Sequence, residues 1–419
     1  GVRLWLIMAA MAANVFLVAM DATIIATAIP YITDTFDSTS DMGWYSSAYL
    51  FTSSVFQLVW GRLYTHFPMQ HCLLVAIVIF MAGSALCGAA PSSACLIGGR
   101  ALAGVGAAGL LGSTGVVVAQ TIALQYRALL DSILGGLYGV AGVVAPVIGG
   151  ALTSRASWRW CFYINLPVGG VCLIVTKFLL NLPPSNPDGA ALPLVQKLRH
   201  LDPLGIVTLT PMVVCLLLAL QLGGSSYEWS NGRIIALLVL SAVFLVLFVA
   251  WQFYRREKAL IPIRILGHRS ILASAWFVLA GNASMTCVEY YLPVYFQTSK
   301  GASPLASGYM LLPTILSYII TALVSGAAIS RIGYFTPFML AGGIIKSIGD
   351  GLMTTFTAST PTGRWIGYQI LAGMGGGLGL QASMLPAQAV LPSKDVALGL
   401  AVLNFASVFG GAIFMSVAD

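Results

Sequence analysis

The sequence predicts an all-α polytopic membrane protein, built from two six-helix bundles with two extra helices between them. Of its 419 residues, 58% are hydrophobic and only 8% are charged, whereas soluble domains average about 25% charged residues. Continuous apolar runs of about 20 residues, the length that crosses a bilayer core, recur along the whole chain. These runs exclude a water-soluble enzyme, and because they do not alternate residue by residue, they also exclude a β-barrel.

Thirteen transmembrane helices account for the apolar runs. We place them at residues 4–29, 43–64, 71–90, 95–119, 130–153, 160–181, 204–222, 233–254, 270–296, 304–328, 335–357, 364–388 and 395–418. A cytoplasmic N-terminus puts most of the loop Lys and Arg on the inside, as the positive-inside rule requires. The seven Cys are scattered, without the paired spacing of a zinc site or a disulfide framework.

The second half of the chain repeats the first. Arg100 to Gly106 aligns with Gln369 to Gly375, and Asp131 aligns with Asp395. We therefore expect an N-terminal six-helix bundle (1–182), a cytoplasmic linker (183–203) with a short amphipathic segment from Leu192 to Leu201, two inserted helices (204–254), a second linker (255–269) and a C-terminal bundle with five of six helices present (270–419). A duplicated bundle of this kind predicts transport through a cavity at the membrane midplane.

Two ionisable residues within predicted spans stand out, Asp21 in the first and Arg100 in the fourth. An ionisable group at the bilayer centre costs about 2.5 to 3.5 kcal/mol or more, so it persists where it is paired, hydrated or useful. Burial and a neighbouring Arg act on a carboxyl in opposite directions, so making and breaking one Asp–Arg pair can bind and release a proton. The alternative is a static pair that fixes helix packing.

Three further charges lie in the predicted C-terminal bundle. Glu289, in the ninth span, aligns with Asp21 as a second acid and is either a second proton site or a hydrated carboxylate in an aromatic belt. Lys346 and Asp350 are one turn apart in the eleventh span. We interpret them as a pair that neutralises itself to permit membrane insertion.

Uncharged polar residues on several spans are candidates for the wall of a substrate cavity. They are Asn14, Gln57, Gln120, Tyr138, Gln381 and Asn404. The alternative for each is a hydrogen bond between helices, worth about 0.6 kcal/mol on average.

The fifth span combines small residues with a proline. Its glycines and proline are Gly139, Gly142, Pro146, Gly149 and Gly150. Such a segment packs closely against a neighbouring helix and kinks where the proline removes a backbone hydrogen bond.

These segments resemble the major facilitator superfamily and, within it, the fungal fourteen-span drug:proton antiporters, which include mycotoxin and multidrug efflux pumps. Asp21 to Pro30 (DATIIATAIP) resembles the family's first-span motif, and Arg100 to Ala108 (RALAGVGAA) its fourth-span motif, whose Arg is implicated in proton coupling. Gly139 to Gly150 resembles the antiporter motif. Trp158 to Pro167 (WRWCFYINLP), Leu216 to Gly224 and Tyr291 to Gln297 are similar to stretches of the fungal subgroup.

The chain departs from the family pattern in the loop after the second span, which the resemblance identifies as a gating loop. Gly61 and Arg62 are present there, and Gly326, Arg331 and Gly333 form the second copy, but Thr65 and Pro68 stand where the family has Asp and Gly. Ala145 replaces the Gly that usually precedes the motif proline. We also expect the start of the chain and a fourteenth span to be missing, through fragmentation or natural truncation.

The resemblance implies the major facilitator fold and a proton-coupled antiporter that exports small amphipathic organic compounds, such as drugs, toxins or secondary metabolites. Asp21 would take the proton, Arg100 would tune it, and Glu289 would be a second site. The proton gradient would replace any cofactor. We expect no metal, no enzymatic activity, no nucleic-acid partner, a monomer in the lipid bilayer, and a plasma-membrane location with the vacuolar membrane as the alternative. The rival functions are a proton-coupled importer of a nutrient or metal chelate, and a non-transporting sensor or inactive truncated remnant.

Overall fold

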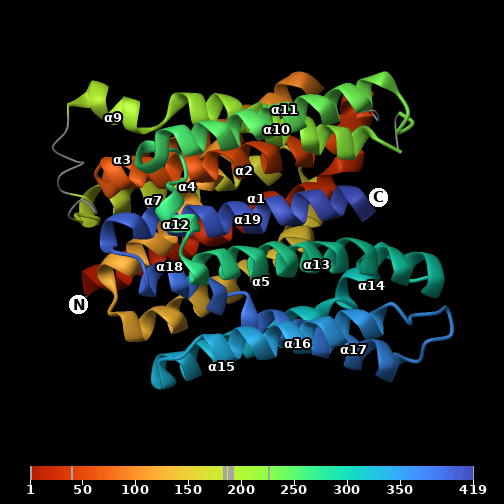
Figure 1. The fold of residues 1–419 in the computed structure, drawn as a ribbon. Coiled ribbons are helices and arrows are strands. Elements are labelled where there is room, and N and C mark those ends of the chain that lie inside the picture. Colours follow the sequence, from red (N-terminus) through yellow and green to blue (C-terminus); the bar gives the residue numbers. More distant parts are fainter. Residues whose placement is uncertain (1, 39–40, 183–185, 187–192, 225–226, 419) are drawn as a thin grey trace. The chain divides into compact units, whose positions relative to one another are not determined.

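A computed structural model of the chain describes residues 2–38, 41–182, 186, 193–224 and 227–418 (Figure 1). The named elements in this part of the chain are all helices. Ten helical stretches of the described residues, some of them made of two adjoining helices, are long and apolar enough to cross a membrane. The predicted all-α membrane architecture is confirmed.

The first six predicted spans are helices with bounds close to those expected. They are α1 (Val2–Phe36), α2 (Met42–His66), α3 (Met69–Gly88), α4 (Ser93–Thr121), α5 (Leu124–Arg155) and the pair α6 (Trp160–Tyr163) and α7 (Asn165–Leu179). The sixth span is divided at Ile164. Pro167 explains the division, because proline has no N–H to bond the carbonyl of Tyr163, four residues earlier.

The inserted pair consists of α10 (Pro203–Leu222) and α11 (Gly232–Arg255), which lie side by side (Figure 1). The predicted amphipathic segment is α9 (Leu194–His200), although Leu192 lies outside the described residues. The second linker contains two short helices, η2 (Arg256–Lys258) and α12 (Ile263–Leu266). Thus each of the two linkers that flank the inserted pair contains short helices.

The second half follows the same order with more interruptions. Its helices are α13 (Arg269–Lys300), α14 (Pro304–Tyr309), α15 (Leu312–Ile332), α16 (Thr336–Met353), α17 (Thr362–Gly379), η3 (Ala382–Met384), α18 (Leu385–Ala389) and α19 (Ser393–Ala418). The single span predicted at 364–388 is wrong beyond Gly379, where α17 ends. A run of glycines before this point and Pro386 after it disfavour a continuous helix.

The helices form two compact units. One contains Gly1–Thr121, Ala141–His268 and Leu391–Phe405, and the other contains Ile122–Val140, Arg269–Val390 and Ala406–Asp419. The first unit packs α4 between α3 and α2, and the second packs α17 between α16 and α15 in the same way. Because α5 and α19 each contribute to both units, the domain boundaries drawn from the sequence stay a prediction.

Matching glycines make the same close contacts in the two units. Gly83 of α3 lies against the backbone of Ala103 in α4, and Gly349 of α16 lies against the backbone of Ala372 in α17. In both places a Cβ atom would collide with main chain, so the helices approach as closely as only glycine allows. The repeat inferred from the sequence is therefore visible in the packing.

Candidate functional site

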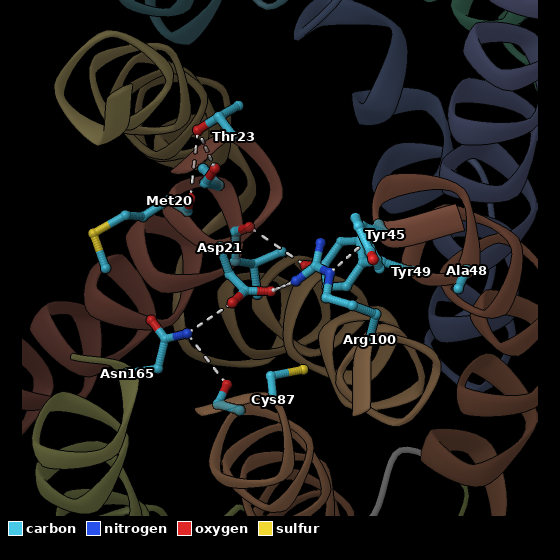
Figure 2. Close-up of polar contacts among 12 residues, drawn as sticks. Met20, Asp21, Thr23, Tyr45, Ala48, Tyr49, Cys87, Arg100 and Asn165 are labelled. Atoms are coloured by element: carbon cyan, nitrogen blue, oxygen red, sulfur yellow. Dashed lines mark hydrogen bonds and ion pairs between the residues drawn. The ribbon is translucent and has the colours of Figure 1, made fainter. Parts of the chain in front are cut away.

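The two charges predicted within the first bundle form a buried ion pair. Arg100 Nη1 of α4 donates to Asp21 Oδ2 of α1 across 2.6 Å, as Figure 2 shows. Neither residue exposes any surface. A buried pair of this kind repays its desolvation only when the remaining polar atoms are also bonded, so the neighbours of both side chains decide what the pair can do.

Helix α2 supplies two further contacts to the guanidinium group. Arg100 Nε donates to the carbonyl oxygen of Tyr45 across 2.9 Å, and the guanidinium carbon lies 4.3 Å from the centre of the Tyr49 ring. Three contacts thus fix the arginine side chain, namely those with Asp21, with the Tyr45 carbonyl oxygen and with the Tyr49 ring. Its Nη2 is a buried donor without a hydrogen-bond partner among the described residues, which leaves one donor free for a new acceptor.

Asn165, the first residue of α7, completes the site. Its Nδ2 donates to Asp21 Oδ1 across 2.8 Å (Figure 2). It also donates to Ser84 Oγ of α3 across 3.2 Å. It exposes no surface. Sequence reasoning missed Asn165, although it lies in the segment Trp158 to Pro167 that resembles the fungal subgroup and stands two residues before Pro167, where the sixth span divides.

This arrangement joins five helices through one carboxylate. Each Asp21 oxygen accepts from a different helix, Oδ2 from α4 and Oδ1 from α7, while α2 and α3 hold the two donors. A proton on Asp21 would remove the charge that pairs with Arg100 and weaken the two bonds that the carboxylate accepts, from Arg100 and from Asn165. The contacts of this carboxylate and of its two donors thus link the packing of the five helices.

Replacing Asn165 by Leu should lower the thermal unfolding temperature by several degrees. The change leaves Asp21 Oδ1 buried without a donor, and an unsatisfied buried polar group costs about 1 to 3 kcal/mol. Asn14→Leu is the matched control, because neither amide atom of buried Asn14 has a partner among the described residues. Scanning fluorimetry of both variants checks this, and an equal loss in the two would contradict it.

Glu289 does not meet Asp21 or Arg100 in the described contacts. It lies on α13 in the other unit, with an exposed side chain. It interacts electrostatically with Lys346, Tyr138 and Tyr318. Its role as a second proton site stays a prediction.

The cavity candidates divide between the two units. Asn14 and Gln57 are buried in the first unit with all four of their amide atoms unbonded among the described residues. Tyr138 is exposed, and Gln381 donates to the Tyr318 hydroxyl across 3.3 Å in the second unit. Gln120 and Asn404 are half-buried. Buried amides without partners are the strongest candidates, because a ligand or water would satisfy them.

The glycines of the antiporter-like segment have unequal surroundings. All lie on α5, which contains Pro146. A Cβ atom at Gly149 would collide with Thr27 and Ile24 of α1, whereas Gly142 and Gly150 face open space and Gly139 has ordinary contacts. Close helix packing therefore explains Gly149 alone.

The residues expected in the gating loop lie on helices. Gly61 and Arg62 belong to the last turns of α2, and Gly326 and Arg331 belong to α15. Gly333 ends α15 with a φ of 81°, which glycine adopts readily. The loop itself begins only after His66, because α2 continues through the polar residues that end its apolar run.

Arg62 instead anchors the linker that follows the inserted helices. Its Nε donates to the carbonyl oxygen of Leu260 across 3.2 Å. Fully buried Asp202, at the start of α10, accepts from the Leu260 N–H and from Trp251 Nε1, both across 2.7 Å. The peptide groups of Leu260 are thus bonded on both sides.

A second arginine ties this linker to α19. Arg264 Nη2 and Nε of α12 donate to the two carboxylate oxygens of Asp395 across 2.7 and 3.2 Å. Arg264 also pairs with Glu257. This bidentate contact with Asp395 matches the planar geometry of the guanidinium group.

Comparison with known proteins identifies the family. The family model of the Major Facilitator Superfamily matches residues 11–415. The chain belongs to this superfamily. This chain is 46% identical to MFS-type efflux pump MFS1 of Arthroderma benhamiae, and the alignment covers all of this chain and 78% of the pump. It is 44% identical to efflux pump aflT of Aspergillus parasiticus, covering all of this chain and 81% of that pump.

Solved structures confirm the major facilitator fold. The proton:xylose symporter XylE matches with a TM-score of 0.66 at 12% identity, over 98% of this facilitator and 87% of XylE. The human organic anion transporter MFSD10 matches with a TM-score of 0.65 at 14% identity, over 99% and 92%. The facilitator is an integral multi-pass membrane transporter.

Proposed function

We propose that this transporter is a proton-driven exporter of small amphipathic organic molecules that works by alternating access. The observation that carries the proposal is the buried Asp21–Arg100 pair, because its carboxylate can take up a proton and its contacts link the packing of five helices. The relatives described above are named efflux pumps, which supports export as the direction. Export of organic compounds from the cell places the transporter in the plasma membrane.

In the proposed cycle the proton and the substrate alternate. A proton on Asp21 neutralises the carboxylate and loosens its bonds to Arg100 and Asn165, which allows the helices to rearrange. Loss of the proton restores the pair. Asn14 and Gln57 lie buried in the same unit and would offer their amides to the polar part of a substrate.

Dye retention in yeast cells tests the proposal. Cells that produce the chain should retain less rhodamine 6G than cells that produce the Asp21→Asn variant, and a protonophore should remove the difference. Higher retention with the unchanged chain would indicate an importer. Retention equal to that of the variant, with or without the protonophore, would count against proton-driven export of this dye class.

A further inference from the structure

The second unit contains a polar cluster that the proposed cycle does not use. Lys346 Nζ and Asp350 Oδ2, both on α16, are 3.3 Å apart, with side chains that are 9% and 25% exposed. Ser284 Oγ of α13 donates to Asp350 Oδ2. The sequence interpretation of a self-neutralising pair needs no partner from another helix, yet the carboxylate has one.

The packing of α16 shows which residue of the first unit Asp350 corresponds to. Gly375 of α17 packs on the backbone of Lys346, as Gly106 of α4 packs on the backbone of Phe80. Gly349 and Gly83 are matched in the same way by their contacts with α17 and α4. Asp350 therefore occupies the place of Ser84, the residue that Asn165 joins to Asp21.

The prolines inside the two helices indicate which residue of α13 corresponds to Asp21. Pro30 lies within α1 and Pro293 within α13. Ser284 precedes Pro293 by the same number of residues as Asp21 precedes Pro30. The structure therefore favours pairing Asp21 with Ser284 and not with Glu289, which lies more than one turn nearer to the proline.

The two units thus hold the same two side-chain types in exchanged places. In the first unit the carboxylate is on α1 and the hydroxyl on α3, whereas in the second the hydroxyl is on α13 and the carboxylate on α16. The positively charged residue also lies on a different helix in the second unit. Gln369 stands at the place of Arg100 and is bonded to Thr314, and Lys346 on α16 supplies the positive charge.

Among the described residues, Asp350 pairs with Lys346 on its own helix, and Lys346 in turn interacts electrostatically with Glu289 on α13. The ammonium group therefore keeps a carboxylate neighbour when Asp350 is neutral. A buried cation left without any counter-charge would oppose protonation of its partner. Here the second acid lowers that penalty.

We propose that Asp350 is a second proton-binding site, with Lys346 as its counter-charge and Ser284 as the residue that positions the carboxylate. The proton comes from water and returns to water, and Lys346 stays charged throughout. The inference rests on the proposed proton-driven function, because it assigns a second site for the same ion.

Infrared difference spectra of the purified chain between pH 8 and pH 5.5 test this site without any substrate. The protonated carboxyl stretch should contain separate contributions from Asp21 and Asp350. Asp350→Asn should remove one and Asp21→Asn the other. Glu289→Gln should leave the Asp21 contribution unchanged and shift that of Asp350 to lower pH, because Lys346 then has Asp350 as its one carboxylate neighbour. Loss of a band in Glu289→Gln, with no change in Asp350→Asn, would overturn the proposal. Loss in Asp350→Asn but not in Asp21→Asn would instead overturn the proton role of Asp21.

A transposed variant guards against a trivial effect on folding. Ser284→Asp combined with Asp350→Ser restores the first unit's arrangement, with the carboxylate on α13 and the hydroxyl on α16. The band lost in Asp350→Ser alone should return in the double variant if the site needs one carboxylate between these helices. A folded double variant without the band would contradict the proposed equivalence of the two positions. If the double variant fails to fold, the single Asn and Gln variants still decide.

Discussion

Replacing Asp21 by Asn is expected to abolish gradient-driven dye export while the protein stays folded. The amide keeps the shape of the carboxyl but binds no proton and carries no charge for Arg100. The site can accommodate the new amide. Asn165 Oδ1 has no partner among the described residues, so rotation of the Asn165 amide presents an acceptor to the new N–H donor. Rhodamine 6G efflux measures the loss of export, and size-exclusion chromatography measures whether the variant stays folded.

Asp34→Asn is the matched control for this variant. Asp34 lies on the same helix, α1, but is exposed. The same chemical change there should leave efflux near the level of the unchanged chain. Normal export by Asp21→Asn, driven by the proton gradient, would refute the coupling role of the buried carboxylate.

Arg100→Lys should impair export nearly as much as Arg100→Ala. The guanidinium group bonds Asp21 through Nη1 and Tyr45 through Nε, and its flat face covers the Tyr49 ring. One ammonium group cannot reach these three partners in their fixed geometry. Hydrogen bonds of charged groups contribute about 1.5 to 3 kcal/mol each, so losing one alone lowers the equilibrium constant for the paired state about tenfold or more, and we expect export to fall with it.

Arg159→Lys provides the comparison, because a single nitrogen makes both hydrogen bonds there. The guanidinium carbon also lies 4.5 Å from the centre of the Trp158 ring, a contact that an ammonium group can make as well. Arg159 Nη1 donates to the carbonyl oxygens of Gly88 and Ala90 across 2.9 and 2.8 Å. A lysine ammonium reproduces two bonds from one atom, so this variant should export nearly normally. Full activity of Arg100→Lys would reduce Arg100 to a generic positive charge.

The charged members of the first site were predictable, and their neutral partners were not. Asp21 and Arg100 are conspicuous because charges are rare within apolar spans, and the structure places them in contact. Asn165 carries no charge, and polar amides are common between membrane helices. The contact to Tyr45 uses a backbone carbonyl, which every residue has. Contacts of this kind follow from helix packing, which one sequence does not reveal.

Alignment by residue type and alignment by the prolines give different partners for Asp21 in the second half. Pairing acid with acid joins Asp21 to Glu289, whereas the prolines Pro30 and Pro293 join Asp21 to Ser284. Proline changes the backbone path, so it marks the register of a helix more firmly than a side chain that can exchange places with another. The presence of each helix was predictable because apolar length is a property of the whole segment. The breaks at Gly379 and Ile164 depend on local backbone chemistry and were not predicted.

The bonds around Leu260 limit how the transporter can be shortened. Asp202 holds the Leu260 N–H and Arg62 holds its carbonyl oxygen. A shortened chain made by excising residues 204–254 would keep both anchors but lose Trp251, a donor to Asp202, and would bring the ends of the cut together at a buried carboxylate. Asp202 and Arg62 are both buried, and such an excision would expose their charges. Engineering of a smaller transporter should therefore begin by replacing both residues with neutral ones.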